Sequence, residues 1–561
     1  MAESASQARI ERYHRLKGER EGVFDTLWQD IFNYMLPRKS QILEKKTPSA
    51  EEYANRIHNN TAGDANIVLA SGLVTNTTPA TERWAVFDAP WQLKARNGGS
   101  PEAEKWFAEV SEITMSVIAG TNFYSEIHEF HLERNPGGTA MLYIEEGKDT
   151  PVVFKTIPLG TYTFALNEEG TLDTVMREFE LTARQAVQKF GLANLGDKVK
   201  AAYESNTGKD KKFCFLHTVE PNEEREPGQY DGGNKPFKSC YDSLEDKMAV
   251  QEGGYDEMPY VISRFLLWPG EIWGYGPGID ALPIVRQVNE MEKNMDVLGE
   301  TAAFPRILVP SNMYGTINYA PGTETPMDES AGQFGQPREW LTGGRYDIGK
   351  DRIEIKDKAI RKIFHNELFQ MLGQMEPGRL TAYEVMQRVS EKLELFVPVF
   401  QRFTKECLEP ALLRTFGILF RAGFYPEPPI EVLEPVGADV SGAPVYNLVK
   451  PKVSFQSKMA LAIKALENRS FVEFMQIMEP IAQIKPEVLD AVNFDRAVPD
   501  IARNLGLPTR WETTEEEMQA IKQSRAQAQQ MAQAAEMMES MSKSAANVGK
   551  APPEMRSAMG M

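Results

Sequence analysis

The chain has 561 residues, of which 42% are hydrophobic and 25% are charged, and these proportions are ordinary for a soluble protein. A chain of this length is expected to fold into about two to four domains. No apolar run is long enough to span a membrane, and the polar N-terminal segment lacks the apolar core of a secretory signal. The three cysteines, Cys214, Cys240 and Cys407, have no metal-like spacing, so we expect buried thiols in a reducing compartment.

The formal net charge is −18, which argues against a tight grip on nucleic acid, because such binding needs a basic surface. Two interpretations of the acidic excess stay open. Either the excess negative charge only keeps the protein soluble, or it repels the phosphates of DNA so that DNA passes the protein without binding.

Helical patterns dominate the first part of the chain. The predicted helical segments cover 1–40, 55–78 and 101–120. The first is an amphipathic helix pair, with Gly18 and Gly22 loosening its middle and Pro37 ending it. The second is rich in small residues that allow close approach of a neighbour. The third is opened by Pro101, and acids in its first turn suit the helix dipole.

From about residue 139 the pattern changes to alternating stretches rich in β-branched and aromatic residues. The expected strands lie within 139–182, 211–221 and 258–270. A short helix over 181–191 is stopped by Gly191, and a polar loop fills 224–236. This half of the chain is therefore predicted to be α+β with a mostly antiparallel sheet.

Residues 276–302 predict a long helix with a narrow apolar seam. Steps of three and four residues connect the members of this seam, which are Ile284, Val288, Met291, Met295, Leu298 and Ala302. Charged residues such as Glu290, Asp296 and Glu300 lie off the seam. The pattern fits a core helix of a globular domain, and it also fits a helix that packs against a copy of itself in a ring. Both interpretations stay open.

An insert rich in proline and glycine, residues 303–350, follows this helix. Two short strands are expected in it, within 306–310 and 316–321. Because a long segment without helix rarely sits in a core, the insert is expected to protrude and make contacts. The helical pattern returns over 351–372, with apolar positions Ile355, Ala359, Ile363, Leu368, Phe369 and Leu372.

A short loop with glycine and proline comes next. Its residues are Gly373, Gln374, Met375, Glu376, Pro377, Gly378, Arg379 and Leu380. Thr381 and Glu384 then form a predicted capping box, in which the hydroxyl accepts from the Glu384 N–H and the carboxylate accepts from the Thr381 N–H. Arg379 beside Glu376 is either an ordinary polar turn or, repeated around a ring, a source of weak and easily exchanged phosphate contacts.

A helix of unusual length is predicted from 382 to about 422, with Gly423 as its C-cap. About 40 residues of helix extend roughly 60 Å, which suits a radial strut better than a compact domain. Pro398 and Pro410 each remove a backbone hydrogen bond and are expected to kink it. Its apolar positions are Met386, Val389, Leu393, Phe396, Phe400, Phe403 and Cys407.

The C-terminal part has a helical pattern with few apolar residues. Three helices are predicted within 455–506, and a capping box over 513–516 begins a helix rich in Gln, Ala and Met. The weak seam of that helix comprises Met518, Ile521, Ala528, Met531, Ala535 and Met538. A tube of such helices around a ring and a frayed tail both fit this composition, and 551–561 are expected to be disordered.

Motifs that carry chemistry are scarce in the sequence. It has no G-x-x-x-x-G-K-[ST] motif that would cradle a phosphate. His128 and His131 are three residues apart rather than four, so we expect an ordinary pair on a helix surface instead of two zinc ligands. The histidines and cysteines give no convincing nucleophile and base. We therefore expect no enzymatic activity, no cofactor and no metal.

Five segments, taken in order, resemble the portal (head-to-tail connector) proteins of short-tailed, podovirus-type bacteriophages. They are RYHRLKGERE with the following Trp and YMLPRKS (12–40), YGPGIDALPIVRQVNEMEKN (275–294), PRILVP (305–310), TAYEVMQRVSE (381–391) and ECLEPALLRTFGILFRAGFYPEPP (406–429). The resemblance spans most of residues 10–510. It depends on the order and spacing of these segments rather than on one diagnostic motif.

The resemblance implies an α+β portal-like ring subunit. In chain order, the implied parts are the helical and β-rich part of the wing (1–275), a stem helix (276–302), a small β-containing clip (303–350), a second stem helix (351–372), the channel loop (373–381), the rest of the wing with its long spine helix (382–450), the helical crown (451–510), and a barrel helix with a disordered tail (511–561).

For the function, the resemblance implies a dodecameric ring at one capsid vertex that serves as the channel for genome packaging and ejection. The implied partners are further copies of the chain, a tail adaptor protein at the clip, the terminase motor during packaging, the major capsid protein, and double-stranded DNA held non-specifically in the channel, with no membrane. The protein would assemble in the host cytoplasm and reside in the virion. The alternatives are a viral DNA-processing or internal ejection protein without a portal ring, and a generic scaffold protein with a long helix.

Overall fold

The computed structural model is an α+β protein that divides into two units, Met1–Ile463 and Lys464–Met561. The structure describes residues 2–37, 42, 49–90, 93, 100–205, 207–225, 234–303, 307–308, 338–339, 346–373, 382–438, 444–461 and 463, and single residues or short groups between 474 and 538. In the second unit, the described residues Ile521, Met531 and Met538 are helical and exposed. The three helices predicted within 455–506 and the tail 551–561 lie largely outside the described residues. The elements below belong to the first unit.

The N-terminal helix pair is one continuous helical run. Helix α1 (Ala2–Arg20) passes through a π-helical turn, η1 (Glu21–Asp25), directly into α2 (Thr26–Met35). The predicted helices are confirmed, but the loose middle is an inserted π turn rather than a gap. Buried Arg20 and Asp25, five residues apart, form an ion pair of 2.8 Å, a spacing that matches the i to i+5 geometry of a π turn.

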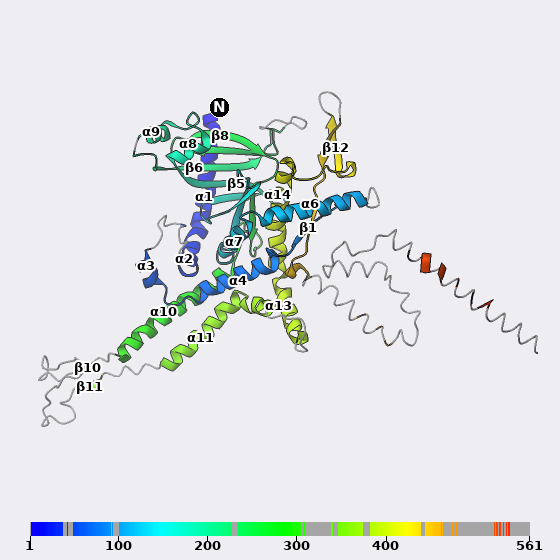
Figure 1. The fold of residues 1–561 in the computed structure, drawn as a ribbon. Helices are drawn as coiled ribbons and strands as arrows, with labels where there is room; N and C mark the ends of the chain where they lie inside the picture. The colour runs from blue at the N-terminus through cyan, green and yellow to red at the C-terminus, as the bar shows by residue number, and fades with distance from the viewer. Residues whose placement is uncertain are drawn as a thin grey trace, which may run out of the picture. The chain divides into compact units, whose positions relative to one another are not determined.

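A five-stranded antiparallel sheet lies beside α1, in the order β4-β5-β6-β7-β8 (Figure 1). Its strands are β4 (Tyr162–Leu166), β5 (Leu172–Thr182), β6 (Lys212–Pro221), β7 (Phe237–Ser243) and β8 (Met248–Tyr255). Neighbouring β6 residues point to opposite faces: Phe215 packs with α8 (Ala183–Phe190) and α9 (Asp197–Glu204), whereas Leu216 packs with α1. Helices therefore cover both faces of the sheet.

A smaller antiparallel sheet, β3-β2-β9, carries the main hydrophobic core. Its strands are β2 (Thr139–Glu146), β3 (Val152–Ile157) and β9 (Tyr260–Arg264). Helices α6 (Pro101–Ala119), α7 (Phe123–Gly137) and α14 (Glu409–Arg421) supply much of the rest of the core. Strand β1 (Ala85–Asp88) pairs with β14 (Lys452–Phe455), and Val453 joins this core. Residues 451–463, which the resemblance assigns to the crown, thus belong to the first unit.

The predicted antiparallel α+β pattern is confirmed, with some differences in detail. The strand expected over 258–270 is only β9, and the hairpin of β7 and β8 and the helix α9 were not predicted. Helix α7 was expected only as a helix that carries His128 and His131. The short helix α8 begins with a capping box at Thr182 and ends before Gly191, whose φ is +79°. The segment 55–78 contains the end of α3 (Ala50–Arg56), a break, and α4 (Thr61–Thr77).

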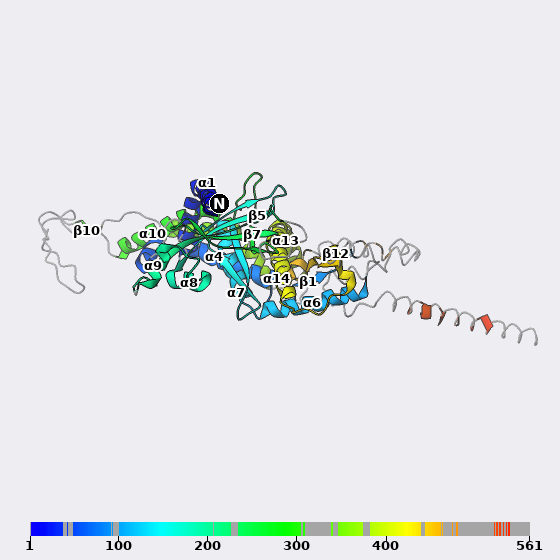
Figure 2. The ribbon, with the colours of Figure 1, turned by 90° about the horizontal axis from the view of Figure 1, so that it is seen from above.

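Helices α10 (Pro277–Ala303) and α11 (Tyr346–Ile363) run side by side and form a hairpin, as Figures 1 and 2 show. Between them, β10 (Ile307–Leu308) pairs antiparallel with β11 (Arg338–Glu339). The single helix predicted over 351–372 is wrong. It is divided into α11 and α12 (Asn366–Gly373), because His365 adopts a left-handed φ of +54° that a right-handed helix cannot continue.

The long helix predicted from 382 is present. It consists of α13 (Ala382–Phe403), a π-helical turn, η6 (Thr404–Leu408), and α14, and it ends before Gly423 with a φ of +74°. Pro398 lies inside α13, and Pro410 lies in the first turn of α14, just after η6. A short 3-10 turn, η7 (Ile430–Val432), and the hairpin of β12 (Leu433–Ala438) and β13 (Pro444–Leu448) follow. Whether the prolines kink the helix stays a prediction.

Candidate functional site: the α10–α11 hairpin and the long helix

The base of the hairpin is a crossing of two backbones without side chains between them. Gly274, Gly276 and Gly278, before and at the start of α10, lie against the end of α7. A Cβ atom at Gly276 would collide with the carbonyl oxygen of Asn135, and one at Gly278 with the backbone of Pro136. Gly138 in turn has a φ of +80°. Glycine is needed here because only a bare backbone fits the close approach and the left-handed conformation.

A buried asparagine fixes the first half of α10. Asn289 is 8% exposed, and its side-chain oxygen accepts hydrogen bonds from the backbone N–H groups of His58 (2.8 Å) and Asn59 (3.3 Å). Its amide donates to the carbonyl of Arg56 at 2.9 Å. The link between α3 and α4 thereby holds α10 in one rotation about its axis.

Polar contacts then join α10 to α11. The Lys356 ammonium donates to the side-chain oxygen of Gln287 at 2.6 Å. The Asn59 amide donates to Glu292 on α10 and to Asp357 on α11, at 3.4 Å each. Burial raises the pKa of Asp357, while hydrogen bonds from Thr61 and Asn59 act against that rise. At the base of α10, Arg286 forms an ion pair with Asp30 of α2.

The predicted seam of α10 faces inward only in part. Val288 is fully buried, whereas Ile284, Met291, Met295 and Leu298 are half-buried. Met295 lies against α11 of the same chain, because a Cβ atom at Gly349 would collide with its sulfur. An intramolecular partner thus covers part of the seam, and its packing against a second copy stays a prediction.

On α10 and α11, the faces that point away from the buried side chains expose some apolar residues. Val297, nine residues after buried Val288, lies half a turn round the helix and is 56% exposed. On α11, Ile348 and Ile355 are 47% and 66% exposed. These two residues are seven positions apart and so share one face, opposite the buried Ile353 and Ile360. We call Val297, Ile348 and Ile355 the apolar stripe of the hairpin.

The predicted channel loop falls between two described helices. Gly373 is the last residue of α12 rather than a loop residue, and α13 begins at Ala382. The residues Gln374, Met375, Glu376, Pro377, Gly378, Arg379, Leu380 and Thr381 lie outside the described residues. Glu384 is helical, but its side chain lies outside the description as well. The start of α13 therefore agrees with Thr381 as its cap, while the capping box itself stays a prediction.

The long helix is anchored to the sheets through its π turn. Glu406 in η6 accepts from the Arg264 side chain at 2.7 and 3.1 Å and from the Arg264 backbone N–H at 2.8 Å. Further along, Arg414 and Arg421 both donate to Glu257, at 2.6 and 2.7 Å. The apolar residues predicted for this helix from Leu393 to Cys407 are buried, which confirms the described part of that pattern.

Helix α7 contains the two histidines, and the expectation of a surface pair is wrong for one of them. His131 is fully buried against Arg134 and the ring of Phe403. Burial, with the positive charge of Arg134, lowers the pKa of His131. The Arg134 guanidinium lies over the rings of Phe265 and Phe403, at 5.2 and 4.9 Å. The contacts of His131 and Arg134 with Phe403 hold α7 against the long helix.

Among the residues that the structure describes, no three His, Cys, Asp or Glu side chains are grouped so that they could hold a metal ion. Within the same residues, none of the helices is long and apolar enough to cross a membrane.

Sequence reasoning missed several of the residues that position the hairpin. Asn289 has the local pattern of a surface polar residue, and its partners are distant in sequence. The same is true of Arg264 and Glu406, which anchor the long helix. The close backbone contacts of Gly274, Gly276 and Gly278 were not predicted either. The density of these glycines before a helix was the available signal, since glycines at every second position indicate close backbone approach.

Comparison with known proteins gives two findings. Residues 6–511 match the family model described as "Bacteriophage head to tail connecting protein". The chain is also 27% identical over 543 residues to the "Portal protein" of Salmonella phage epsilon15, covering 96% of this chain and 94% of that protein. Over 546 residues it is 27% identical to the "Probable portal protein" of Bordetella phage BPP-1, with the same coverage of both chains.

Proposed function

Because the chain belongs to the family of bacteriophage head to tail connecting proteins, we propose that it is a portal subunit. Copies of the chain close into a ring at one capsid vertex. We expect twelve copies in each ring. The ring is the channel through which the genome is packaged and ejected. The role is structural, and the energy for packaging comes from a separate terminase motor that docks on the ring.

The observation that carries this proposal is the apolar stripe on the α10–α11 hairpin. Val297, Ile348 and Ile355 expose about half or more of their surface, although their helices are otherwise rich in charge. Burying the exposed half to two thirds of such a side chain contributes about 1–2 kcal/mol. A ring supplies that burial, because each hairpin then has a neighbouring copy on either side.

The remaining parts follow from their place in the chain. The hairpin helices form the stem, and residues 303–350 between them form the clip, where a tail adaptor protein docks. The two sheets and the long helix form the wing, which faces the major capsid protein. Residues 464–510 complete the crown, and 511–548 form a barrel of helices above it.

The segment that follows Gly373, residues 374–380, is the channel loop, where double-stranded DNA passes close to the protein. The support is the bracketing of this segment by α12 and α13, which end at Gly373 and begin at Ala382. Arg379 in each copy touches phosphates singly and weakly. Such contacts are salt-sensitive and exchange quickly, which suits DNA that moves.

Mass measurement of the purified protein tests the ring. A closed assembly of about twelve copies supports the proposal, and a monomer or an open filament contradicts it. Replacing residues 373–380 by a Gly/Ser linker then tests the loop separately. That variant should assemble as the unchanged chain does but fail to package or retain DNA, and normal genome retention would show that the loop has no such role.

A further inference from the structure

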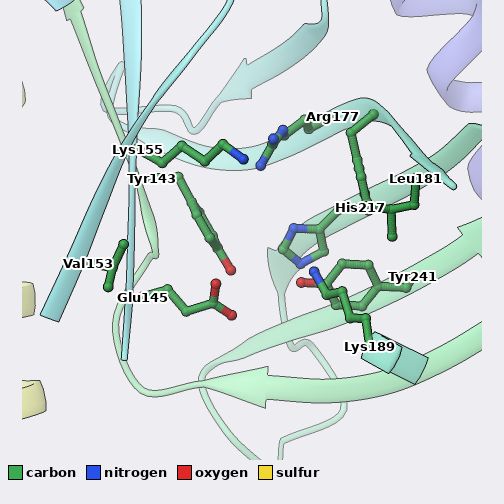
Figure 3. A pocket seen from close by; sticks show the side chains of 10 residues that line it. Tyr143, Glu145, Val153, Lys155, Arg177, Leu181, Lys189, His217 and Tyr241 are labelled. Atoms are coloured by element: carbon green, nitrogen blue, oxygen red, sulfur yellow. The ribbon is translucent and has the colours of Figure 1, made fainter. Parts of the chain in front are cut away.

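A cavity of about 140 Å³ lies between the three-stranded sheet and the five-stranded sheet, and none of its lining residues belongs to the hairpin. It is lined by Tyr143, Glu145, Val153, Lys155, Arg177, Phe179, Leu181, Lys189, His217 and Tyr241 (Figure 3). The lining residues of β2, β3 and β5 are spaced two apart, so each strand turns one face toward the cavity.

Three cations converge on this cavity from separate elements. Lys155 comes from β3, Arg177 from β5 and Lys189 from α8, and the Lys155 and Arg177 side chains end close together (Figure 3). None of the three forms an ion pair with a carboxylate among the described residues. Two of them lie over aromatic rings: Arg177 is 5.3 Å from the Phe179 ring, and Lys189 is 4.6 Å from the Tyr241 ring.

The cluster is positively charged, although the chain as a whole has 80 acidic and 62 basic residues. Buried cations elsewhere in the same unit, such as Arg9 and Arg20, have a carboxylate within 2.8 Å, whereas the Lys155 and Lys189 side chains are exposed and remain accessible to a ligand. Here Glu145 is the one acid among the lining residues, so the cavity holds three positive charges against one negative charge. Burial lowers the pKa of Lys155, and the charge of Arg177 lowers it further. Burial likewise lowers the pKa of Lys189, while the negative charge of Glu145 acts against that decrease.

The stacked rings of His217 and Tyr241, which line the cavity, contribute to its shape rather than to its charge. His217 stacks on Tyr241 with ring centroids 4.0 Å apart, and burial lowers its pKa, so the ring is neutral. Both of its nitrogens are occupied, by the hydroxyl groups of Tyr260 at 2.6 Å and Ser239 at 3.0 Å. The cations are therefore the groups that remain to bind a ligand.

The volume limits the ligand. A cavity of about 140 Å³ holds four or five waters at about 30 Å³ each, whereas sites for nucleotides and drug-sized molecules have about 300 Å³ or more. It has room for a single carboxylate or phosphate group. We propose that Lys155, Arg177 and Lys189 form a binding site for such an oxyanion, either a free ion or an acidic side chain of a protein.

Calorimetric titration of the full chain at constant ionic strength tests this site, with inorganic phosphate as one probe and N-acetylglutamate amide as the other. We expect at least one probe to bind with a dissociation constant of about 1 mM or lower. Binding of phosphate alone identifies a free ion as the ligand, and binding of the glutamate derivative alone identifies a protein carboxylate. Both results support an oxyanion site, whereas binding by neither probe overturns it.

Variants then show whether the cavity is responsible. Lys155→Gln and Lys189→Gln are both at exposed positions, so the fold should persist. Each should weaken binding about tenfold, because each removes a charge-assisted contact. Lys211→Gln is the matched control, since Lys211 also lies over an aromatic ring, Phe213 at 5.4 Å, outside the cavity. Equal weakening by the control, or unchanged binding in both cavity variants, overturns the proposal.

Discussion

The α10–α11 hairpin differs from the rest of the first unit, which we call the body, in the kinds of side chain that are buried or exposed. In the body, charged groups that leave water find partners within the chain: Arg9 with Asp242, Arg20 with Asp25, and Arg264 with Glu406. In the hairpin, by contrast, apolar Val297 and Ile355 remain exposed. The body also exposes single apolar residues, such as Val23 and Trp268, but its buried charges are paired within one chain, and we propose that a second copy covers the exposed face of the hairpin. Stability measurements should report mainly on the body, and assembly measurements on the hairpin.

The largest loss of stability is expected from breaking a buried ion pair of the body. Arg9 holds α1 against β7 through hydrogen bonds of 2.9 and 2.7 Å to Asp242, which is fully buried. Arg9→Met leaves that carboxylate without its guanidinium and should cost about 3–5 kcal/mol of unfolding free energy. Urea denaturation followed by circular dichroism measures the loss.

The same helix offers a matched control for this change. Arg12 forms an ion pair of 2.8 Å with Glu220, but its side chain is 38% exposed. Arg12→Met should cost no more than about 1 kcal/mol. Equal losses in the two variants would mean that α1 is held by apolar packing, and not by the buried pair.

A somewhat smaller loss is expected at the glycine crossing, where body and hairpin meet. Gly138→Ala introduces a left-handed alanine whose Cβ collides with the carbonyl oxygen of Gly274, so we expect a cost of about 3 kcal/mol. Gly170→Ala is the control, because Gly170 has a similar φ of +77° but open space around its Cβ position. It should cost about 1 kcal/mol, and similar losses in both variants would contradict the collision.

Acid should destabilise the body progressively. His131 and His217 are fully buried, and burial lowers the pKa of each from 6.5. Below pH 6.5 the unfolded chain binds protons that the folded chain does not, so stability falls as the pH falls. Each histidine contributes a slope of up to about 1.4 kcal/mol per pH unit.

His217→Gln tests that slope. The urea midpoint, measured between pH 7 and pH 5, should fall less steeply with decreasing pH than in the unchanged chain. The reason is that one of the two buried histidines no longer takes up a proton on unfolding. His14→Gln, at an exposed histidine on α1, controls for the loss of an imidazole. If His217→Gln and the unchanged chain fall in parallel, His217 is not the group that takes up protons on unfolding.

The sequence predicted the elements of both regions wherever their signals were local. Pro101 and Gly191 fixed helix ends, and alternation of side chains predicted the antiparallel strands. Helix α7 was expected only around His128 and His131, and its extent was not predicted, because His131, Glu133, Arg134 and Asn135 are all buried and leave no contrast between a polar and an apolar face. The break at His365 was missed because no glycine or proline marks it.

Long-range features could not be predicted from local patterns. Strand β14 pairs with β1, more than three hundred residues earlier, and Glu406 pairs with Arg264 of β9. The cations of the cavity lie on three elements that only the packing of two sheets brings together. For the hairpin, helical spacing predicted α10 and its seam, but exposure of Ile348 and Ile355 depends on where α11 packs.

The smallest effect on stability, and the most direct test of the hairpin, is expected from its apolar stripe. Ile355→Asp replaces a side chain that is 66% exposed, so the unfolding free energy of the single chain should change by no more than about 0.5 kcal/mol. In a ring the same change buries a carboxylate at the interface between copies. The assembly constant per interface should then fall about tenfold or more, because the lost apolar burial is worth about 1–2 kcal/mol and the carboxylate is buried in addition.

Sedimentation velocity over a range of protein concentrations separates these two effects. Ile430→Asp is the control, since Ile430 is 82% exposed and lies outside the hairpin. It should leave both stability and assembly unchanged. If Ile355→Asp assembles like the control, the exposed face of α11 does not lie between copies, and the covered surface must be sought elsewhere. If Ile355→Asp unfolds more easily as a single chain, Ile355 is part of the body's own packing, and the contrast between the two regions fails.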